Sequence, residues 1–168
     1  MKKVIYYIIL LLCMGAGKAG AQYSFSGNIT SSVSIQPVTV LSLTNNASTA
    51  VTLSNTQLSN GYTVTGFNTI NIKSNQAWNL SVTAVTPYFS ASGTYASANM
   101  PASVIGLAKS GQSSFINLST TAQLLASGNR GSYTTSGNSF NMDFKANPGY
   151  NYGPGIYSLS ILYTLSAQ

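Results

Sequence analysis

The stretch Trp78-Asn79-Leu80-Ser81-Val82-Thr83 alternates large apolar with small polar side chains for six residues. Strict alternation places one set of side chains on a buried face and the other in water, which is typical of a half-buried β-strand. The same period of two recurs at residues 139–145 and 156–165. The valine, isoleucine, threonine and aromatic residues of these runs also suit a pleated sheet. The pattern therefore predicts an all-β protein.

Turn residues separate the alternating runs. Asn60-Gly61 is a hairpin-type dipeptide, and Asn147-Pro148-Gly149 and Gly153-Pro154-Gly155 interrupt the chain near its end. Many short strands joined by glycine- and proline-rich turns indicate a two-sheet antiparallel β-sandwich of the Ig-like kind. About eight strands are expected, near residues 23–35, 38–43, 49–54, 62–65, 68–73, 77–86, 138–145 and 156–166.

The segment 97–127 has no clear period. Residues 114–118 are expected to add a short ninth strand. Residues 118–125 fit either a helical turn or a strand with a loop, and periodicity does not decide between them.

The N-terminus has the three parts of a secretory signal peptide. Met1-Lys2-Lys3 is positively charged, residues 4–14 are apolar, and Ala19-Gly20-Ala21 supplies small residues before Gln22. The apolar run is too short to span a bilayer, and no second long run follows. We therefore expect residues 1–21 to be a removable leader and residues 22–168 to form one exported domain, at the cell surface, outside the cell or in the periplasm.

The only cysteine, Cys13, lies inside the expected leader, so residues 22–168 cannot form a disulfide. Leu12 precedes it where a lipoprotein signal would have a small residue, and we therefore expect no lipid on the protein. Stability must then come from the hydrophobic core alone.

The composition argues against catalysis and metal binding. Asp143 is the one acidic residue of the chain, and there is no histidine. General acid–base catalysis, a hydrolytic triad and a metal site each need several such groups to converge. We therefore expect a binding or structural protein without enzymatic activity, metal or cofactor.

The charge is low and dispersed. Beyond the leader, Lys73, Lys109, Arg130 and Lys145 stand against Asp143, which leaves a net charge of +3. Because these cations never cluster, a nucleic-acid partner is not expected. Asp143 and Lys145, two residues apart on one strand face, are expected to form an ordinary ion pair.

Two motifs that lie far apart in the sequence indicate a more specific class of protein. Trp78-Asn79-Leu80 lies in the middle of the chain, and the segment 157–165 ends it. The pair resembles the bacterial WxL surface domain, in which a proximal Trp-x-Leu is followed by a distal Tyr-x-x-x-apolar-Thr-Trp-x-Leu near the C-terminus. Tyr157, Ile161 and Leu165 match the distal motif, whereas Leu162 replaces its threonine and Tyr163 its tryptophan.

The resemblance implies a secreted, non-enzymatic domain that attaches non-covalently to the cell envelope, with peptidoglycan as the family's usual surface. On this basis the candidate binding residues are Trp78, Leu80, Tyr157, Ile161, Tyr163 and Leu165. A second interpretation is equally simple. Alternation puts the motif residues of each strand on one face, so they could instead be the centre of the core.

A further candidate site is the tyrosine cluster near the C-terminus. Tyr150 and Tyr152 lie among glycines shortly before Tyr157. A tyrosine ring has a flat apolar face and a polar tip, which suits the stacking of a sugar ring. The alternative is a loop whose tyrosines only cover one end of the sandwich.

Two functions follow from these observations. The first is a surface domain that binds an envelope polymer, either peptidoglycan or another glycan. The second is a structural subunit of a surface fibre or pilus-like assembly, whose partners are other surface proteins. In that case the early segment 23–35 would pair with a neighbouring sandwich as a donated strand.

Overall fold

The computed structural model describes residues 31–47 and 50–168. Gln36–Gln168 form one compact unit, and the chain up to Ile35 is a separate unit. In that separate unit, residues 31–35 carry no helix or strand. The expected strand at 23–35 is therefore wrong for residues 31–35, whereas residues 23–30 and the expected leader lie outside the described residues.

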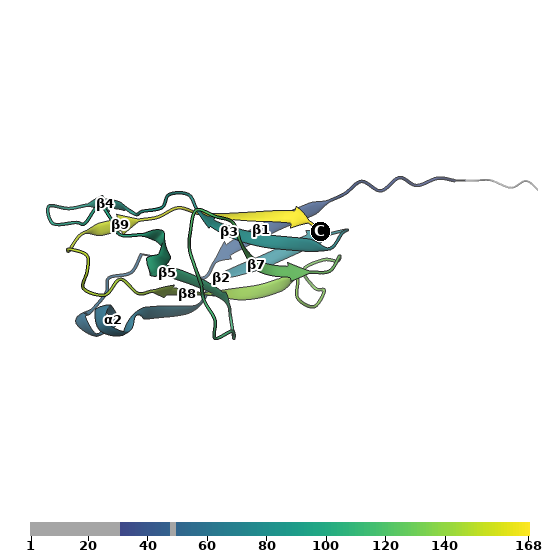
Figure 1. Cartoon of the computed structure of the whole chain (residues 1–168). Helices are drawn as coiled ribbons and strands as arrows, with labels where there is room; N and C mark the ends of the chain where they lie inside the picture. The colour runs from purple at the N-terminus through teal and green to yellow at the C-terminus, as the bar shows by residue number, and fades with distance from the viewer. Residues whose placement is uncertain (1–30, 48–49) are drawn as a thin grey trace, which may run out of the picture. The chain divides into compact units, whose positions relative to one another are not determined.

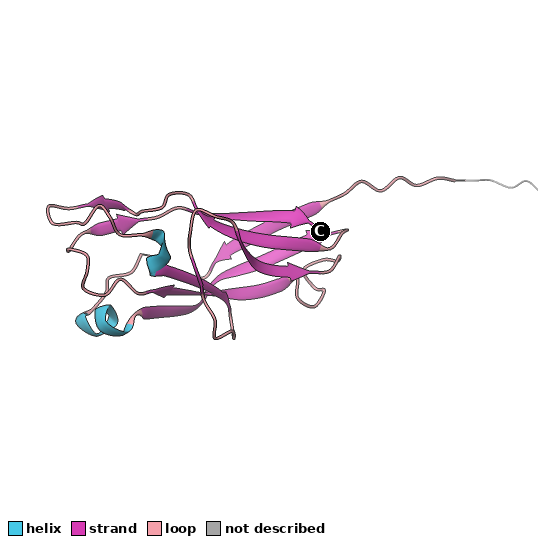
Figure 2. Ribbon diagram, in the orientation of Figure 1, coloured by secondary structure: helices cyan, strands magenta, loops and turns pink. Residues whose placement is uncertain are grey.

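The compact unit is an all-β antiparallel sandwich, as predicted, and its strands form two facing layers and a small ribbon (Figures 1 and 2). The larger sheet has the order β1-β2-β8-β5-β6, the smaller has the order β10-β3-β7, and β4 pairs with β9 in the ribbon. The strands of the larger sheet are β1 Thr39–Asn45, β2 Tyr62–Ser74, β5 Ile105–Lys109, β6 Ile116–Asn117 and β8 Ser139–Ala146. The others are β3 Trp78–Ala84, β4 Ser90–Ser92, β7 Gln123–Gly128, β9 Ile156–Ser158 and β10 Ile161–Ala167.

The core lies between the two sheets and follows the alternation of the sequence. Each strand contributes every second side chain, because successive side chains point to opposite faces. In β3 the buried residues alternate strictly with partly exposed ones. β8 places Phe140, Met142 and Phe144 in the core, and Asp143 between them is buried as well. Fully buried members of the core are Ile70, Ile72, Trp78, Leu80, Val82, Leu107 and Met142.

The runs 62–65 and 68–73 belong to one strand, β2, rather than two. A β-bulge between Val64 and Asn68 shifts the register against β8, and Gly66 in the bulge has a φ of 64°. Only glycine adopts this left-handed conformation without steric cost. Because the bulge interrupts the alternation of side chains, the sequence pattern of this one strand resembles that of two.

The expected strand at 49–54 is wrong for residues 50–54, which precede a short helix, α2 (Asn55–Asn60). Ser54 and Gln57 form a capping box: the Gln57 backbone N–H donates to Ser54 Oγ at 3.4 Å, and the Ser54 N–H donates to Gln57 Oε1 at 2.8 Å. This reciprocal pair satisfies two backbone donors at the start of a helix. A serine followed three residues later by glutamine is a helix signal that the alternation concealed.

The segment 97–127 contains the 3₁₀ helix η1 (Ala102–Val104) and the strands β5, β6 and β7. β6 confirms the short ninth strand. Of the two structures considered for residues 118–125, the strand with a loop is confirmed. The expected strand at 156–166 is instead two strands, β9 and β10, which belong to different sheets.

Candidate functional site

The structure places the proximal motif and the later part of the distal motif, from Ile161 to Leu165, on adjacent strands. β10 runs antiparallel to β3, so that Leu165 lies opposite Leu80, and Ala167 lies opposite Trp78. Trp78 and Leu80 are fully buried, however, and cannot touch a ligand at the protein surface. Their position favours the core interpretation of the proximal motif.

The Trp78 side chain has a specific place in the core. Its indole Nε1 donates a hydrogen bond to Asn138 Oδ1 at 3.1 Å. Gly128 lies opposite Trp78 on β7, and a Cβ atom at this glycine would lie 2.3 Å from Trp78 Cζ2. The bare backbone of Gly128 therefore provides the space that the indole ring occupies.

The distal motif residues on β10 lie at the border of the core. Ile161, Tyr163 and Leu165 are partly buried and pack against it. Burial raises the pKa of Tyr163 to about 12, and the side chain of Asn68 opposes this shift in part. Tyr163 thus packs against the core rather than presenting an open aromatic surface.

Tyr157, the first residue of the distal motif, lies on β9, in the ribbon. Its hydroxyl donates to the Gly153 carbonyl at 2.5 Å and accepts from the Ser97 backbone N–H at 2.9 Å. Its ring meets Phe89 edge to face, with ring centroids 6.4 Å apart. Tyr157 therefore fastens two loops to each other.

The tyrosines proposed as a glycan platform differ in exposure. Tyr150 has an exposed ring, and its hydroxyl lies 3.0 Å from both the Asn55 carbonyl and Ser59 Oγ of α2. Tyr152 is only partly exposed. Tyr150 is hydrogen-bonded to α2, and Tyr157 to the 93–97 loop. The two rings are therefore held by different parts of the chain.

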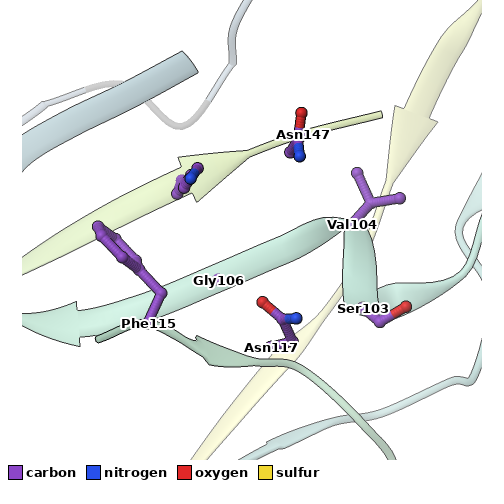
Figure 3. Close-up of a pocket in the computed structure, with 7 residues that line it drawn as sticks. Ser103, Val104, Gly106, Phe115, Asn117 and Asn147 are labelled. Carbon is purple, nitrogen blue, oxygen red and sulfur yellow. The ribbon is translucent and has the colours of Figure 1, made fainter. Parts of the chain in front are cut away.

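A shallow depression of about 220 Å³ lies on the outer face of the larger sheet (Figure 3). Gly106 on β5 lies opposite both Lys145 on β8 and Asn117 on β6, which places the three residues in one row across the sheet. Directly opposite residues project to the same face. We call this site the Gly106 depression; its lining residues are Ser103, Val104, Gly106, Phe115, Asn117, Lys145 and Asn147.

The absence of a side chain at Gly106 keeps the depression open. A Cβ atom there would lie 3.0 Å from Phe115 Cβ and 3.4 Å from Asn117 Oδ1. The labelled side chains surround this glycine, as Figure 3 shows. The sequence alone does not reveal the site, since its residues come from three segments that only the sheet order brings together. The only indication of this site in the sequence was the aromatic and amide pair Phe115 and Asn117, which lies in a region without a clear period.

The depression combines one aromatic ring, one cation, two amides and one hydroxyl. Lys145 Nζ lies 5.8 Å from the centroid of the Phe115 ring. None of its lining residues is acidic. Such a set offers hydrogen-bond donors and acceptors beside an apolar face, and Lys145 favours a ligand with a carboxylate or another electron-rich group.

Asp143 does not pair with Lys145, so the expected ion pair is wrong. The Asp143 Oδ1 atom accepts a hydrogen bond from the Gly66 backbone N–H at 2.9 Å and another from Ser110 Oγ. The carboxylate is buried, and it fixes the β2 bulge. A bulge leaves a backbone N–H outside the strand ladder, and this donor, at Gly66, binds the carboxylate instead of Lys145.

The three lysines of the described residues each lie over a different aromatic ring. Lys73 Nζ is 4.8 Å from the Tyr133 centroid, and Lys109 Nζ is 4.8 Å from the Phe140 centroid. Residues 31–47 and 50–168 contain no group of three or more potential metal ligands. In the same part of the chain, no helix has the length and apolar character needed to cross a membrane.

No protein-family model matches this chain, and no match is found among curated proteins.

Proposed function

We propose that this chain is a non-enzymatic cell-surface domain that binds an envelope glycan non-covalently through the Gly106 depression. The observation that carries the proposal is the row Lys145–Gly106–Asn117, with Phe115 beside it, on an outer sheet face. Resemblance to the WxL domain supports an envelope ligand.

The size of the depression fits one sugar unit of a longer polymer. Its volume of about 220 Å³ lies below the roughly 300–1,000 Å³ of sites that enclose a drug-sized ligand. Phe115 offers a flat apolar surface for the C–H face of a sugar ring. Asn117 and Asn147 can hydrogen-bond its hydroxyl or N-acetyl groups, and Lys145 can pair with a carboxylate.

Regular backbone pairing holds the binding residues in place. Lys145 and Asn117 lie on strands that flank β5 in the same sheet, and the Asn147 backbone N–H donates to the Val104 carbonyl at 3.0 Å. Side chains placed on rigid strands lose less freedom on binding. A weak single contact would be strengthened when many copies bind a repetitive polymer.

The state of Asp143 supports a function without catalysis. Glycoside hydrolysis commonly requires two carboxyl groups flanking the bond that breaks. Asp143 is the only acidic residue, and its buried carboxylate is bound by Gly66 and Ser110. The Trp78 motif contributes to this function by holding the sandwich together rather than by touching the ligand.

Co-sedimentation with purified cell envelope tests the proposal. We expect the protein to sediment with the envelope at low salt and at about 1 M salt, where the screening length falls to about 3 Å. Aromatic and amide contacts survive such screening, whereas non-specific attraction of scattered cations does not. Complete release at high salt, or no binding at either concentration, would contradict the proposal.

A further inference from the structure

The outer edge of β1 has no neighbouring strand within the described residues. β1 ends the strand order of the larger sheet and pairs only with β2. Natural edge strands are usually protected by lysine, proline or a bulge, because their free backbone groups attract other strands. β1 contains only Thr39-Val40-Leu41-Ser42-Leu43-Thr44-Asn45, without charge or proline, and pairs with β2 in continuous register.

Three large hydrophobic side chains on β1 or directly before it are exposed: Val38, Val40 and Leu43. Leu43 lies opposite the fully buried Ile70 and so projects to the core face of the sheet, yet it is 42% exposed. The core is therefore open along β1.

The neighbouring edge of the smaller sheet is similar. β10 lies close to β1 and pairs only with β3 within the described residues. Its core-facing residues Ile161, Tyr163 and Leu165 are only partly buried, whereas the β3 residues opposite them are fully or almost fully buried. An added strand along β1 would cover this open side of the core.

We propose that the free edge of β1 accepts the segment Tyr23–Ile35 of a second copy of this chain as an additional strand. The segment alternates apolar and polar residues at both ends, with Tyr23 and Phe25 at its start and Val33 and Ile35 at its end. Its 13 residues exceed the seven of β1, and no charged residue occurs anywhere from Gln22 to Ile72. The segment is therefore long enough to cover the whole edge, its ends alternate as a strand requires, and neither the segment nor the edge carries a charge.

The contacts of Asn75 favour a second copy over the chain's own segment. Its side chain accepts from the Val38 backbone N–H at 2.9 Å and donates to the Gln36 carbonyl at 2.7 Å. The Asn75 backbone N–H also donates to the Val38 carbonyl at 3.1 Å. These bonds hold the residues that lead into β1. To lie along its own β1, the chain would have to reverse direction there and break them.

The concentration dependence of the molecular mass of the full chain tests this interface, and the test is independent of glycan binding. We expect the wild type to assemble as its concentration rises, measured by light scattering after size-exclusion chromatography. The double variant Val33→Lys/Ile35→Lys should require at least about tenfold more protein for the same assembly, because two ammonium groups would be buried against the β1 edge. Leu124→Lys, at an exposed site on β7, is the matched control and should assemble like the wild type.

Cysteine trapping identifies the contact itself. In a Cys13→Ser background, a mixture of Val33→Cys and Leu43→Cys chains should form a disulfide-linked heterodimer, whereas Val33→Cys with Leu124→Cys should not. A wild type that stays monomeric, or a lysine variant that assembles as readily as the wild type, would overturn the proposal. Two further results would overturn it. One is a Val33→Cys/Leu43→Cys chain that forms its disulfide only within one molecule, and the other is Leu43→Cys chains that form disulfides mainly with each other.

Discussion

The indole Nε1 of Trp78 donates a hydrogen bond to Asn138 Oδ1 at 3.1 Å, and neither side chain is exposed to solvent. Trp78 begins β3 in the smaller sheet, and Asn138 directly precedes β8 in the larger sheet. Asn138 also donates through Nδ2 to the Asn129 carbonyl at 3.1 Å, and its own carbonyl accepts from the Ile72 N–H at 2.8 Å. One buried polar pair thus joins both layers and the loop between β7 and β8.

Replacing Trp78 should destabilise the domain strongly. We expect Trp78→Ala to lower the free energy of unfolding by about 3–5 kcal/mol, the usual effect of truncating a buried tryptophan. Urea unfolding measures the loss. Leu124→Ala, at an exposed position on β7, is the control and should change stability by less than about 0.5 kcal/mol. A Trp78→Ala variant that unfolds like the wild type but fails to bind envelope would show that Trp78 is a contact residue.

Gly128→Ala should also destabilise the domain, because the added methyl group would meet the Trp78 ring at 2.3 Å. Overpacking of this kind typically costs about 1–3 kcal/mol. The neighbouring variant Ser127→Ala, on the exposed side of β7, should have little effect. If both variants show the same unfolding midpoint, the close fit between Gly128 and the indole does not contribute to stability.

The role of Asp143 can be separated from its charge. Asp143→Ala leaves the Gly66 N–H and the Ser110 hydroxyl without their acceptor and should cost about 1–3 kcal/mol. Asp143→Asn keeps an oxygen acceptor and should lose clearly less. Thermal or urea unfolding of both variants shows whether Asp143 stabilises the bulge through its hydrogen bonds or through its negative charge. Equal losses would indicate that the negative charge, rather than its hydrogen bonds, stabilises the bulge.

Tyr163 makes stability depend on pH in the alkaline range. Its pKa is raised from 10.0 to about 12, so the folded state holds a proton that the unfolded chain releases first. This contribution is fully present below pH 10, and it is lost as the pH rises to about 12. A shift of this size corresponds to about 3 kcal/mol. Tyr163→Phe should therefore lose less stability than the wild type between pH 10 and 12, and parallel losses would contradict this assignment.

Alternation of side chains was sufficient to predict some of the strands around the core, but not β5, which lies in a segment without a clear period. The runs at 77–86 and 138–145 correspond to β3 and β8, because every second residue in them packs between the sheets. Prediction failed where local hydrogen bonding competes with that period. The capping box of Ser54 begins a helix, and the bulge at Gly66 divides one strand into two apparent runs.

The candidate site could be predicted only in part. The sequence offered core packing as one interpretation of the Trp78 motif, and the structure buries Trp78 and Leu80 fully and places Leu80 opposite Leu165. The Gly106 depression was not predictable, since Lys145 and Asn117 are brought together by the position of β5 between β8 and β6. Sheet order depends on long-range packing, which local patterns do not contain.

The most direct test of the proposed function compares two aromatic residues in similar settings. Phe115 lies under Lys145 in the Gly106 depression, and Tyr133 lies under Lys73 outside it. We would measure the binding of Phe115→Ala and Tyr133→Ala chains to purified envelope glycan, after confirming that each melts as a folded protein. We expect Phe115→Ala to bind about tenfold more weakly, equivalent to about 1.4 kcal/mol, and Tyr133→Ala to bind like the wild type. Equal affinity of the wild type and Phe115→Ala would contradict glycan binding at this site.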